Sequence, residues 1–411
     1  MNKKKILFVS QYFYPETFRG NDIAFHLAEK GHDVHVVTGI PNYPMGKFFS
    51  GYGLWKKRHE VIKGVKVTRL PIVPRGEDNK IMLMLNYCSY LVVGWVWMLF
   101  HAMWHKYDMV FCQQLSPVTM SSPAILYKKL RKVPLYTWVL DLWPESLTAA
   151  AGIKNKVILG FFDWFVKSEY KNSEKILVSS RSFDRSILKY GDYKDKIIYF
   201  PQWSDGVNSI YKNRFELPEV LHDFSKDRDN FIVMFAGAVG EAHGMECNMQ
   251  AALKTREYKH IKWVIVGDGR RLGWVRSFIK DNQLDDTVYA LGHFPSETMP
   301  EFFEKADVML VSLNDSLLFN LYLPAKIASY MAVGRPIVAV LNGEGHEVVK
   351  AAECGWNVKA GDADALANLV IELSQTDRNL LKAKGRNGKA YYDNFFIKEK
   401  CLKNLDEIMN L

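Results

Sequence analysis

The segment Lys5-Ile-Leu-Phe-Val9 is a short apolar run, followed by a loop, a helix over Asp22–Lys30 and a second apolar run over Val34–Thr38. Short apolar runs of this kind are typical of strands buried on both faces, so the succession predicts a parallel βαβ unit. The pattern restarts at Phe231-Ile-Val-Met-Phe-Ala-Gly237. The predicted fold class is therefore α/β, with two Rossmann-like domains whose parallel sheets face an interdomain cleft.

Further strands follow the same pattern of short apolar runs separated by helical stretches. They are expected at residues 109–112, 135–140, 175–179, 196–200, 263–266, 288–290, 308–311 and 337–340. Between the two halves, Pro201–Asn230 is polar and is predicted to be poor in regular structure. We expect this segment to connect the two domains.

The composition fits a large protein with two domains. The chain has 411 residues, of which 48% are hydrophobic, enough for more than one core. Its five cysteines are scattered and lack CxxC spacing, which favours a reducing compartment over a disulfide framework or a zinc site. The apolar run behind Met1–Lys5 stops at Ser10, so it is predicted to be a strand and not a signal peptide.

Basic residues are concentrated in the first half of the chain. Residues 1–200 contain 29 Lys and Arg against 16 Asp and Glu, a net charge of +13, whereas residues 201–411 carry −4. A basic half points to an anionic partner, either nucleic acid or an anionic membrane surface. The basic runs Lys56–Arg58 and Lys128–Lys132 lie beside apolar residues, and the sequence has no RNA-binding or zinc-finger signature. We therefore expect an anionic membrane surface, and no nucleic acid, as the partner.

The stretch Ile81–Trp104 contains no Asp, Glu, Lys or Arg and is rich in large apolar residues. It is long enough to cross a bilayer, which needs about 20 apolar residues. Three interpretations are open: a helix at the membrane interface, a fully buried helix and a true span. We favour the interfacial helix, because Asn86 and His101 lower its apolarity and a strand of the same domain follows closely.

Glycine-bearing turns follow several of the predicted strands, where a phosphate can bind. The segment Gly237–Gly244 joins a strand to a helix, but its spacing is neither the Walker nor the dinucleotide pattern. Leu323–Val340 has the pattern of a loop, a short helix starting near Pro324 and a strand, so this helix start with Lys326 suits an anion. Ordinary tight turns are the alternative at both places.

Six motifs occur in a fixed order along the chain: residues 11–16, 41–46, 141–146, 237–244, 266–269 and 323–336. Together they resemble retaining glycosyltransferases of family 4, and more narrowly the bacterial subgroup that builds O-antigen and capsule repeat units, including the N-acetyl-L-fucosamine transferases. The resemblance runs almost from end to end. It implies a GT-B fold, with an acceptor-binding domain over residues 1–205, a nucleotide-sugar domain over residues 206–390 and a final helix over residues 391–411 that returns to the first domain.

The resemblance also implies an enzyme that transfers a sugar with retention of configuration and without a metal or other cofactor. In agreement, no Asp-x-Asp motif ends a predicted strand, and Asn314-Asp315 is the nearest approach. The expected donor is a UDP-sugar, in particular a deoxy-N-acetylamino hexose. The expected acceptor is a polyprenyl-diphosphate-linked saccharide. Such an enzyme is expected to be cytoplasmic and peripheral on the inner face of the plasma membrane.

Individual residues acquire roles from the same resemblance. Those expected at the donor are Gly20, Asn21, Gly237, Gly240, His243, Gly244, Gly267, Arg271, Tyr322, Leu323, Pro324, Lys326 and Ser329. Asp141 follows an apolar strand and is the first candidate to orient or deprotonate the acceptor hydroxyl, with Glu145 and Glu16 as further catalytic candidates. The alternatives are a helix-start charge for Glu145 and a surface residue for His243.

Three positions depart from the family pattern. Many relatives carry two glutamates that contact the ribose and the donor sugar, and here Leu321 and Ser329 stand in their places. A less polar pocket suits a deoxy sugar, because a missing hydroxyl leaves no partner to satisfy. Leu140 replaces the family histidine before Asp141. Two alternatives therefore stay open: a GT-B UDP-N-acetylglucosamine 2-epimerase and a catalytically inactive scaffold of a polysaccharide assembly complex.

Overall fold

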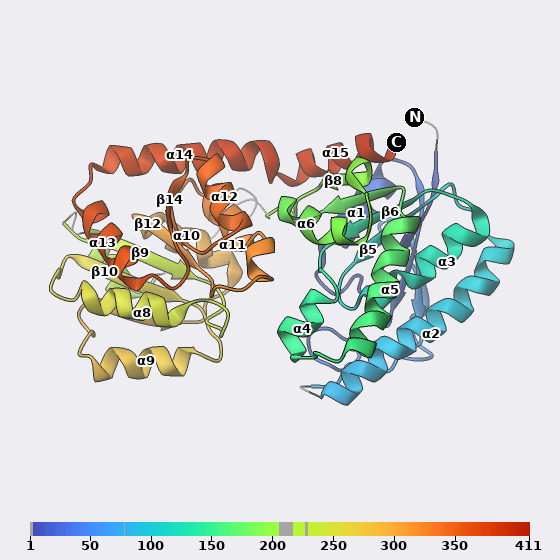
Figure 1. Cartoon of the computed structure of the whole chain (residues 1–411), viewed down its shortest axis with the longest axis horizontal. Helices are drawn as coiled ribbons and strands as arrows, with labels where there is room; N and C mark the ends of the chain where they lie inside the picture. The colour runs from blue at the N-terminus through green and yellow to red at the C-terminus, as the bar shows by residue number, and fades with distance from the viewer. Residues whose placement is uncertain (1–2, 78, 205–216, 227–228) are drawn as a thin grey trace. The chain divides into compact units, whose positions relative to one another are not determined.

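The chain forms two compact units, shown in a computed structural model that describes residues 3–77, 79–204, 217–226 and 229–411 (Figure 1). Unit 1 comprises Met1–Phe200 and Leu402–Leu411, and unit 2 comprises Pro201–Cys401. The predicted boundary between residues 205 and 206 lies outside the described residues. Of the segment 391–411 that is expected to return to the first domain, only Leu402–Leu411 belongs to unit 1.

Unit 1 is built on one eight-stranded sheet. In spatial order its strands are β3 (His59–Ile62), β4 (Val65–Leu70), β2 (Asp33–Gly39), β1 (Lys5–Val9), β5 (Met109–Gln114), β6 (Leu135–Val139), β7 (Lys175–Val178) and β8 (Ile197–Tyr199). Neighbouring strands are parallel except for β3 and β4. The predicted strands of this half are confirmed, whereas β3 and β4 have no counterpart among the predictions.

The helices of unit 1 cover this sheet (Figure 1). They are α1 (Arg19–Glu29), α2 (Lys80–Trp104), α3 (Ser122–Arg131), α4 (Glu145–Ala151), α5 (Lys156–Asn172), α6 (Asp184–Ile187) and most of α15 (Lys398–Met409). The Asn79 side chain accepts from the main-chain N–H groups of Ile81 and Met82, which caps α2. Figure 1 draws α2 as the long light-blue helix at the lower right.

The helix α2 is long and apolar enough to cross a membrane by length and composition. One of its faces is built into unit 1. Asn86 accepts from Gln11 at 2.8 Å between Nε2 and Oδ1, and His101 bonds the Tyr107 hydroxyl at 2.9 Å. The other face is exposed, and Phe100 keeps 64% of its surface in contact with solvent. The interpretation as a fully buried helix is therefore wrong.

Unit 2 contains a six-stranded, wholly parallel sheet. Its strands are β11 (Val288–Gly292), β10 (Ile261–Val266), β9 (Phe231–Ala236), β12 (Val308–Ser312), β13 (Ile337–Val340) and β14 (Gly355–Val358). Its helices are α7 (Glu219–Lys226), α8 (Met245–Lys254), α9 (Leu272–Asp281), α10 (Met299–Lys305), α11 (Ala325–Ala332), α12 (Glu344–Ala351), α13 (Ala363–Ser374) and α14 (Arg378–Phe395). The segment Pro201–Asn230, predicted to lack regular structure, contains α7. The predicted single final helix is instead two helices, α14 and α15.

The sheet of unit 2 is buried on both faces, which explains its continuous apolar strands. Along β9, Phe231, Val233 and Phe235 belong to one hydrophobic cluster, and Ile232 and Met234 belong to another on the opposite face. Alternate side chains of a strand point to opposite faces, so both sets must be apolar. Burial on two faces is thus what makes β9 recognisable in the sequence.

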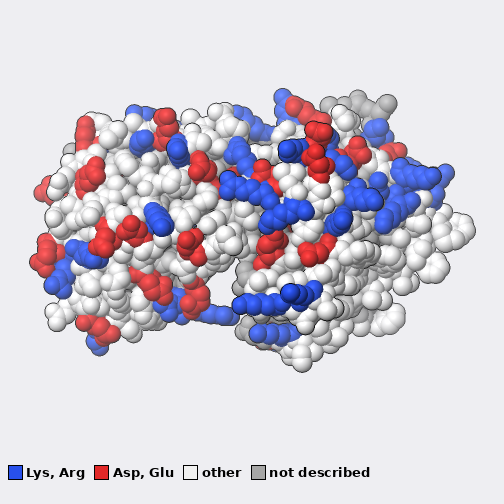
Figure 2. Space-filling view, in the orientation of Figure 1, with Lys and Arg blue, Asp and Glu red and all other residues white. Residues whose placement is uncertain are grey.

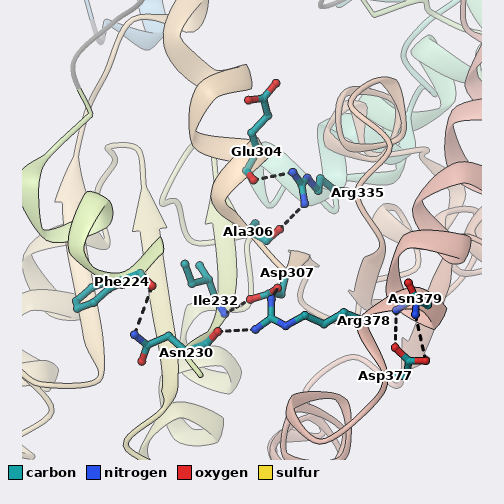
Figure 3. Close-up of polar contacts among 10 residues, drawn as sticks. All are labelled: Phe224, Asn230, Ile232, Glu304, Ala306, Asp307, Arg335, Asp377, Arg378 and Asn379. Carbon is teal, nitrogen blue, oxygen red and sulfur yellow. Dashed lines mark hydrogen bonds and ion pairs between the residues drawn. The ribbon is translucent and has the colours of Figure 1, made fainter. Parts of the chain in front are cut away.

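The amino ends of the strands in unit 2 are held by two arginines (Figure 3). Arg378, the first residue of α14, pairs with Asp307 and donates to the main-chain oxygen of Asn230 at 2.8 Å. Arg335 donates to the main-chain oxygen of Ala306 at 3.1 Å. These residues line a cavity of about 470 Å³. Because both guanidinium groups already bind protein oxygens, we interpret this cavity as a structural junction.

Stability of unit 1 is expected to depend on pH through Glu169. This residue of α5 is fully buried, and burial raises the pKa of its carboxyl from the ordinary value of 4.5 to about 8. The folded state retains the proton, so the stabilising contribution is complete below pH 4.5 and is lost as pH rises to about 8.

We expect Glu169→Gln to remove this decline, which amounts to about 1.4 kcal/mol per pH unit at most. Urea unfolding at pH 5 and pH 9 measures the effect, and the exposed Glu174→Gln is the matched control. Equal differences between the two pH values in wild type and Glu169→Gln would contradict the assignment.

Candidate active site

Two glycine turns at the carboxyl edge of the sheet in unit 2 lie against each other. Gly237 follows β9 with φ of +127°, and Gly267 follows β10 with φ of +138°. A Cβ atom on Gly267 would lie 1.9 Å from the Gly237 oxygen, and one on Gly237 would lie 2.5 Å from Cε of Lys326. Only glycine fits at both places. The predicted turn after β9 therefore brings its backbone directly beside Lys326.

Side chains at the end of β12 fix the position of this turn. Asn314 donates from its main-chain N–H to the Ala242 oxygen at 2.9 Å and from Nδ2 to the Glu241 oxygen at 2.6 Å. The Ser312 hydroxyl donates to the His243 oxygen at 2.8 Å. Sequence reasoning assigned no role to Ser312 and named Asn314 only as part of the nearest approach to an Asp-x-Asp motif. The signal for both was their place directly after an apolar strand.

The helix α11 is attached to β9 through Tyr330. The buried Tyr330 hydroxyl donates to the Ala236 oxygen at 2.9 Å and accepts from the Ala236 N–H at 3.1 Å. Pro324 is the N-cap of α11 and precedes its first residue. Lys326 lies one turn before Tyr330, so the attachment sets where its side chain lies. Tyr330 is a positioning residue that sequence reasoning did not assign.

The Lys326 amine is a cation without a partner. Its Nζ lies 3.7 Å from the centroid of the Phe235 ring and has no hydrogen-bond acceptor among the described residues. Burial lowers the pKa of this amine to about 7. A desolvated amine beside a glycine turn and the start of α11 can bind an anion through charge and main-chain N–H groups. The Gly237–Gly244 turn and Lys326, each predicted to bind an anion, therefore lie side by side, and anion binding there stays a prediction.

His243 lies in the same turn and carries no charge near neutral pH. Its Nδ1 accepts from the main-chain N–H of Gly240 at 3.3 Å. Burial, assisted by the neighbouring Lys326 charge, lowers the pKa of the imidazole to about 4. The structure therefore favours a neutral, hydrogen-bonding His243, and its role at the donor stays a prediction.

The remaining donor candidates of unit 2 have partners of their own. Arg271 pairs with Glu246, and its Nε lies 3.8 Å from a carboxylate oxygen of Glu241. The Ser329 hydroxyl lies 3.2 Å from that of Ser204. Three other candidates lie just before helices. Tyr322 and Leu323 precede α11, and Gly244 precedes α8. Donor roles for these residues stay predictions.

A second helix start adjoins that of α11, and sequence reasoning did not identify it. A Cβ atom on Gly345, in the first turn of α12, would lie 3.2 Å from Cδ of Pro324. The preceding residue, Glu344, is buried and begins α12. The signal in the sequence was a glycine on either side of an acidic residue directly after a strand. Glu344 therefore lies next in sequence to the contact between the starts of α11 and α12.

In unit 1, Glu16 organises the loop that follows β1. Its carboxylate accepts main-chain N–H groups from Tyr43 at 2.7 Å, Asn42 at 2.8 Å and Phe13 at 3.3 Å. Burial nonetheless raises the pKa of Glu16 to about 7. These three hydrogen bonds hold the loop in its shape, and this role accounts for a carboxylate being buried here. A catalytic role for Glu16 stays a prediction.

Gly20 and Asn21 also shape this loop. The Asn21 amide donates to the Glu16 main-chain oxygen at 2.6 Å and accepts from the Tyr14 N–H at 3.1 Å. A Cβ atom on Gly20 would lie 2.0 Å from Oε1 of Gln113 on β5. Both residues are therefore required by close packing within unit 1. Their predicted contact with the donor remains a prediction.

Asp141 and Glu145 contact different elements. Asp141, just after β6, accepts from the Ser116 hydroxyl at 2.8 Å, and Ser116 also accepts from the Trp143 indole at 3.0 Å. Glu145 is the first residue of α4; it accepts from the Ser186 hydroxyl and lies 3.6 Å from the Lys189 amine. The helix-start position considered for Glu145 is thus confirmed.

Within the described ranges, no group of three or more His, Cys, Asp or Glu side chains is arranged to hold a metal ion. The five cysteines are free thiols. Independence from metals stays a prediction.

Comparison with known proteins shows similarity to glycosyltransferases. Residues 230–376 match the family described as glycosyl transferases group 1. A putative colanic acid biosynthesis glycosyl transferase of Escherichia coli (strain K12), WcaI, is 22% identical over 317 residues, or 75% of each chain. A probable glycosyltransferase of Pseudomonas aeruginosa, WbjE, is 23% identical over 274 residues, which are 64% of this chain and 66% of that protein.

Solved glycosyltransferase structures share the fold. Anabaena Alr3699/HepE, in complex with UDP and glucose, superimposes with a TM-score of 0.66 and 15% identity over 99% of each chain. WaaG, a glycosyltransferase involved in lipopolysaccharide biosynthesis, gives a TM-score of 0.60 and 14% identity over 99% of this chain and 100% of that one. At such identities the similarity shows the fold alone. The predicted α/β fold of the GT-B type, with two parallel-sheet domains, is confirmed.

Binding of a nucleoside diphosphate is expected to take up a proton at Lys326. A diphosphate next to the amine favours its charged form, so the pKa rises from about 7 on binding. At pH 8 we therefore expect uptake of close to one proton and, with increasing pH, weaker binding of UDP. Calorimetry in two buffers of different ionisation enthalpy measures this uptake.

The variant Lys326→Met should bind UDP more weakly and without proton uptake. The matched control is Lys254→Met in α8, because Lys254 is exposed and pairs with Asp364 at 2.7 Å. Equal proton uptake by wild type and Lys326→Met would exclude Lys326 from the site.

Proposed function

We propose that this protein, a glycosyltransferase with the GT-B fold, transfers a sugar from a UDP-sugar to a polyprenyl-diphosphate-linked saccharide with retention of configuration. The observation that carries the proposal is the unpaired Lys326 amine, which lies beside Gly237 and next to the start of α11. In this proposal, the site receives the diphosphate of the donor.

The donor side of the proposal is supported by charge. As the bond from the sugar to the diphosphate breaks, negative charge develops on the leaving phosphate oxygen. Fixed donors in a desolvated site stabilise such charge more than water does. Lys326 supplies a full charge, and the Gly237–Gly244 turn and the start of α11 supply main-chain N–H groups. The relative HepE was solved with UDP, which agrees with a UDP-sugar as donor.

The acceptor side is assigned to unit 1. We infer that Asp141, fixed by the Ser116 hydroxyl, orients the acceptor hydroxyl. In a front-face route, that hydroxyl oxygen bonds to the anomeric carbon as the bond to the diphosphate breaks, and its proton passes to the leaving phosphate oxygen. Asp141 then mainly positions the acceptor hydroxyl, because the leaving phosphate oxygen takes the proton. We expect no metal ion, because Lys326 and main-chain N–H groups can stabilise the negative charge of the diphosphate.

Related proteins and the distribution of charge support the proposed pathway and place in the cell. The similar proteins WcaI and WcaL carry names of colanic acid biosynthesis, so we infer that this enzyme builds a bacterial surface polysaccharide, such as O-antigen or capsule. Leu321 and Ser329 offer the donor no carboxylate, which favours a deoxy-N-acetylamino sugar such as N-acetyl-L-fucosamine. The basic first half and the exposed face of α2 favour peripheral attachment to the cytoplasmic face of the plasma membrane.

Asp141→Asn is expected to lower transfer by about a hundredfold or more, because the acceptor hydroxyl loses its orienting charge. The affinity for UDP should stay within about twofold of wild type, since the residue lies in the other unit. Steady-state transfer and UDP titration measure the two effects, with the exposed Asp192→Asn as the matched control. Loss of UDP binding in Asp141→Asn would contradict its assignment to the acceptor.

A panel of UDP- and GDP-sugars, each with and without lipid-linked saccharides, tests the function as a whole. We expect nucleotide release that requires an acceptor, and a product whose anomeric configuration matches the donor by NMR. Release or isomerisation without acceptor would favour an epimerase. Turnover with water-soluble saccharides but with no lipid-linked one would overturn the proposed acceptor class.

A further inference from the structure

A groove of about 620 Å³ follows the exposed side of α2 in unit 1. Residues spaced by four along the helix form one wall, and two residues near β4 border it: Val92, Val96, Phe100, Trp104, Arg58 and Pro71. A row of thirteen helical positions is about 18 Å long at 1.5 Å per residue. The groove therefore extends along about 18 Å of α2, and its wall on α2 is uncharged.

The wall exposes an unusual amount of apolar surface. Val96 is 52% exposed, Phe100 is 64% and Trp104 is 79%. The floor is uncharged as well: His101 lines the groove, its imidazole bonds the Tyr107 hydroxyl, and burial lowers its pKa to about 3. Contiguous exposed apolar surface of this kind marks a site that is covered in use. The lining suits an apolar chain.

One end of the groove carries an unpaired charge. Arg58 is half-buried, and its guanidinium donates only to main-chain oxygens, those of Arg69 and Leu54. Across the described ranges of the chain it has no carboxylate partner, whereas the neighbouring Arg69 pairs with Glu60. Burial lowers the pKa of Arg58, and no acidic neighbour opposes this. A partly desolvated cation of this kind favours an anion at the same end.

That charged end lies at the carboxyl edge of the sheet. Pro71 follows β4, which ends at Leu70, and Arg69 donates to the main-chain oxygen of Tyr14 at 2.8 Å. Tyr14 belongs to the loop organised by Glu16. In contrast, α2 runs away from this edge, since it ends at Trp104 shortly before β5 begins at the opposite edge. A ligand lying in the groove therefore has its anionic end near the loop that Glu16 organises, at the same edge of the sheet as Asp141.

The surroundings match a lipid. Trp55, three residues before Arg58, is 94% exposed and is followed by two exposed lysines, Lys56 and Lys57. Exposed tryptophan next to lysine is typical of segments at a membrane interface. Figure 2 shows that the surface in the region of α2 is almost free of charged side chains, while Lys and Arg gather beside it.

We propose that this groove binds the polyprenyl chain of the acceptor lipid, with Arg58 on its diphosphate. The inference rests on the proposed function, because it takes the acceptor to be a polyprenyl diphosphate. It adds a binding site for the lipid and a direction, with the phosphate at Pro71 and the chain extending toward Trp104. The branched chain lies against the wall formed by Val96 and Phe100. The exposed face of α2 then holds a substrate and is not only a contact with the bilayer.

Titration of the full-length protein with geranylgeranyl diphosphate tests the site, with tryptophan fluorescence as the readout because Trp97 and Trp104 line the groove. We expect saturable binding, and about tenfold weaker binding for Phe100→Ser. The matched control is Met103→Ser, because Met103 is also 64% exposed on α2 but does not line the groove. Its affinity should equal that of wild type.

The charge is tested in the same assay. Arg58→Gln should weaken binding of geranylgeranyl diphosphate but leave binding of geranylgeraniol unchanged, and Lys171→Gln, an exposed position on α5 outside the groove, should change neither. Equal losses in Phe100→Ser and Met103→Ser would show a general apolar surface and overturn the proposal. Displacement by short-chain phosphatidylglycerol at equal concentration would also overturn it, because the groove would then accept any lipid.

The two proposals fail in different ways. If geranylgeranyl diphosphate does not bind, while lipid-linked saccharides are still glycosylated, the groove is excluded and the proposed function stands. If the lipid binds as expected but no lipid-linked saccharide is glycosylated, the acceptor class is wrong and the groove stands.

Discussion

Parallel pairing of the strands is the constraint that places the candidate residues within each unit. Apart from β3, the strands of each sheet run in one direction, so the carboxyl ends of these parallel strands gather at one edge. In unit 1 this edge carries Glu16 and Asp141, which lie far apart in sequence. In unit 2 it carries Gly237, Gly267 and the start of α11. The order and direction of the strands therefore bring these positions to one edge of each sheet, whatever side chains they carry.

At the carboxyl edge of unit 2, electrostatics and packing act together. Tyr330 ties α11 to β9, and this attachment keeps the Lys326 amine against the Phe235 ring, away from any acceptor among the described residues. An amine held in this way pays a desolvation cost, seen in its lowered pKa, that an arriving diphosphate relieves. His243 stays neutral beside it, which avoids repulsion between two cations. Arg271, in contrast, is already neutralised by Glu246.

The sequence was sufficient for the fold wherever strands are buried on both faces. Such strands are continuous apolar runs, as in β1 and β9, and every strand predicted from one is present. It failed at β3, β4 and β14, because these lie at or next to a sheet edge and mix polar with apolar residues. For the site, the sequence predicted which residues take part but not which of them contact one another. The pairing of Arg271, the three N–H groups on Glu16 and the role of Tyr330 depend on distant contacts that no local pattern encodes.

The helix α2 shows why composition alone was ambiguous about the membrane. Its hydropathy is that of a span, yet Asn86 and His101 point into unit 1 and bond to residues beside β1 and β5. Withdrawing that face into lipid would strand both polar groups without partners, at a cost of several kcal/mol each. The opposite face gains nothing from water, because Val96 and Phe100 have no polar atoms in their side chains. A helix bound to unit 1 on one side and apolar on the other agrees with the proposed contact between unit 1 and lipid.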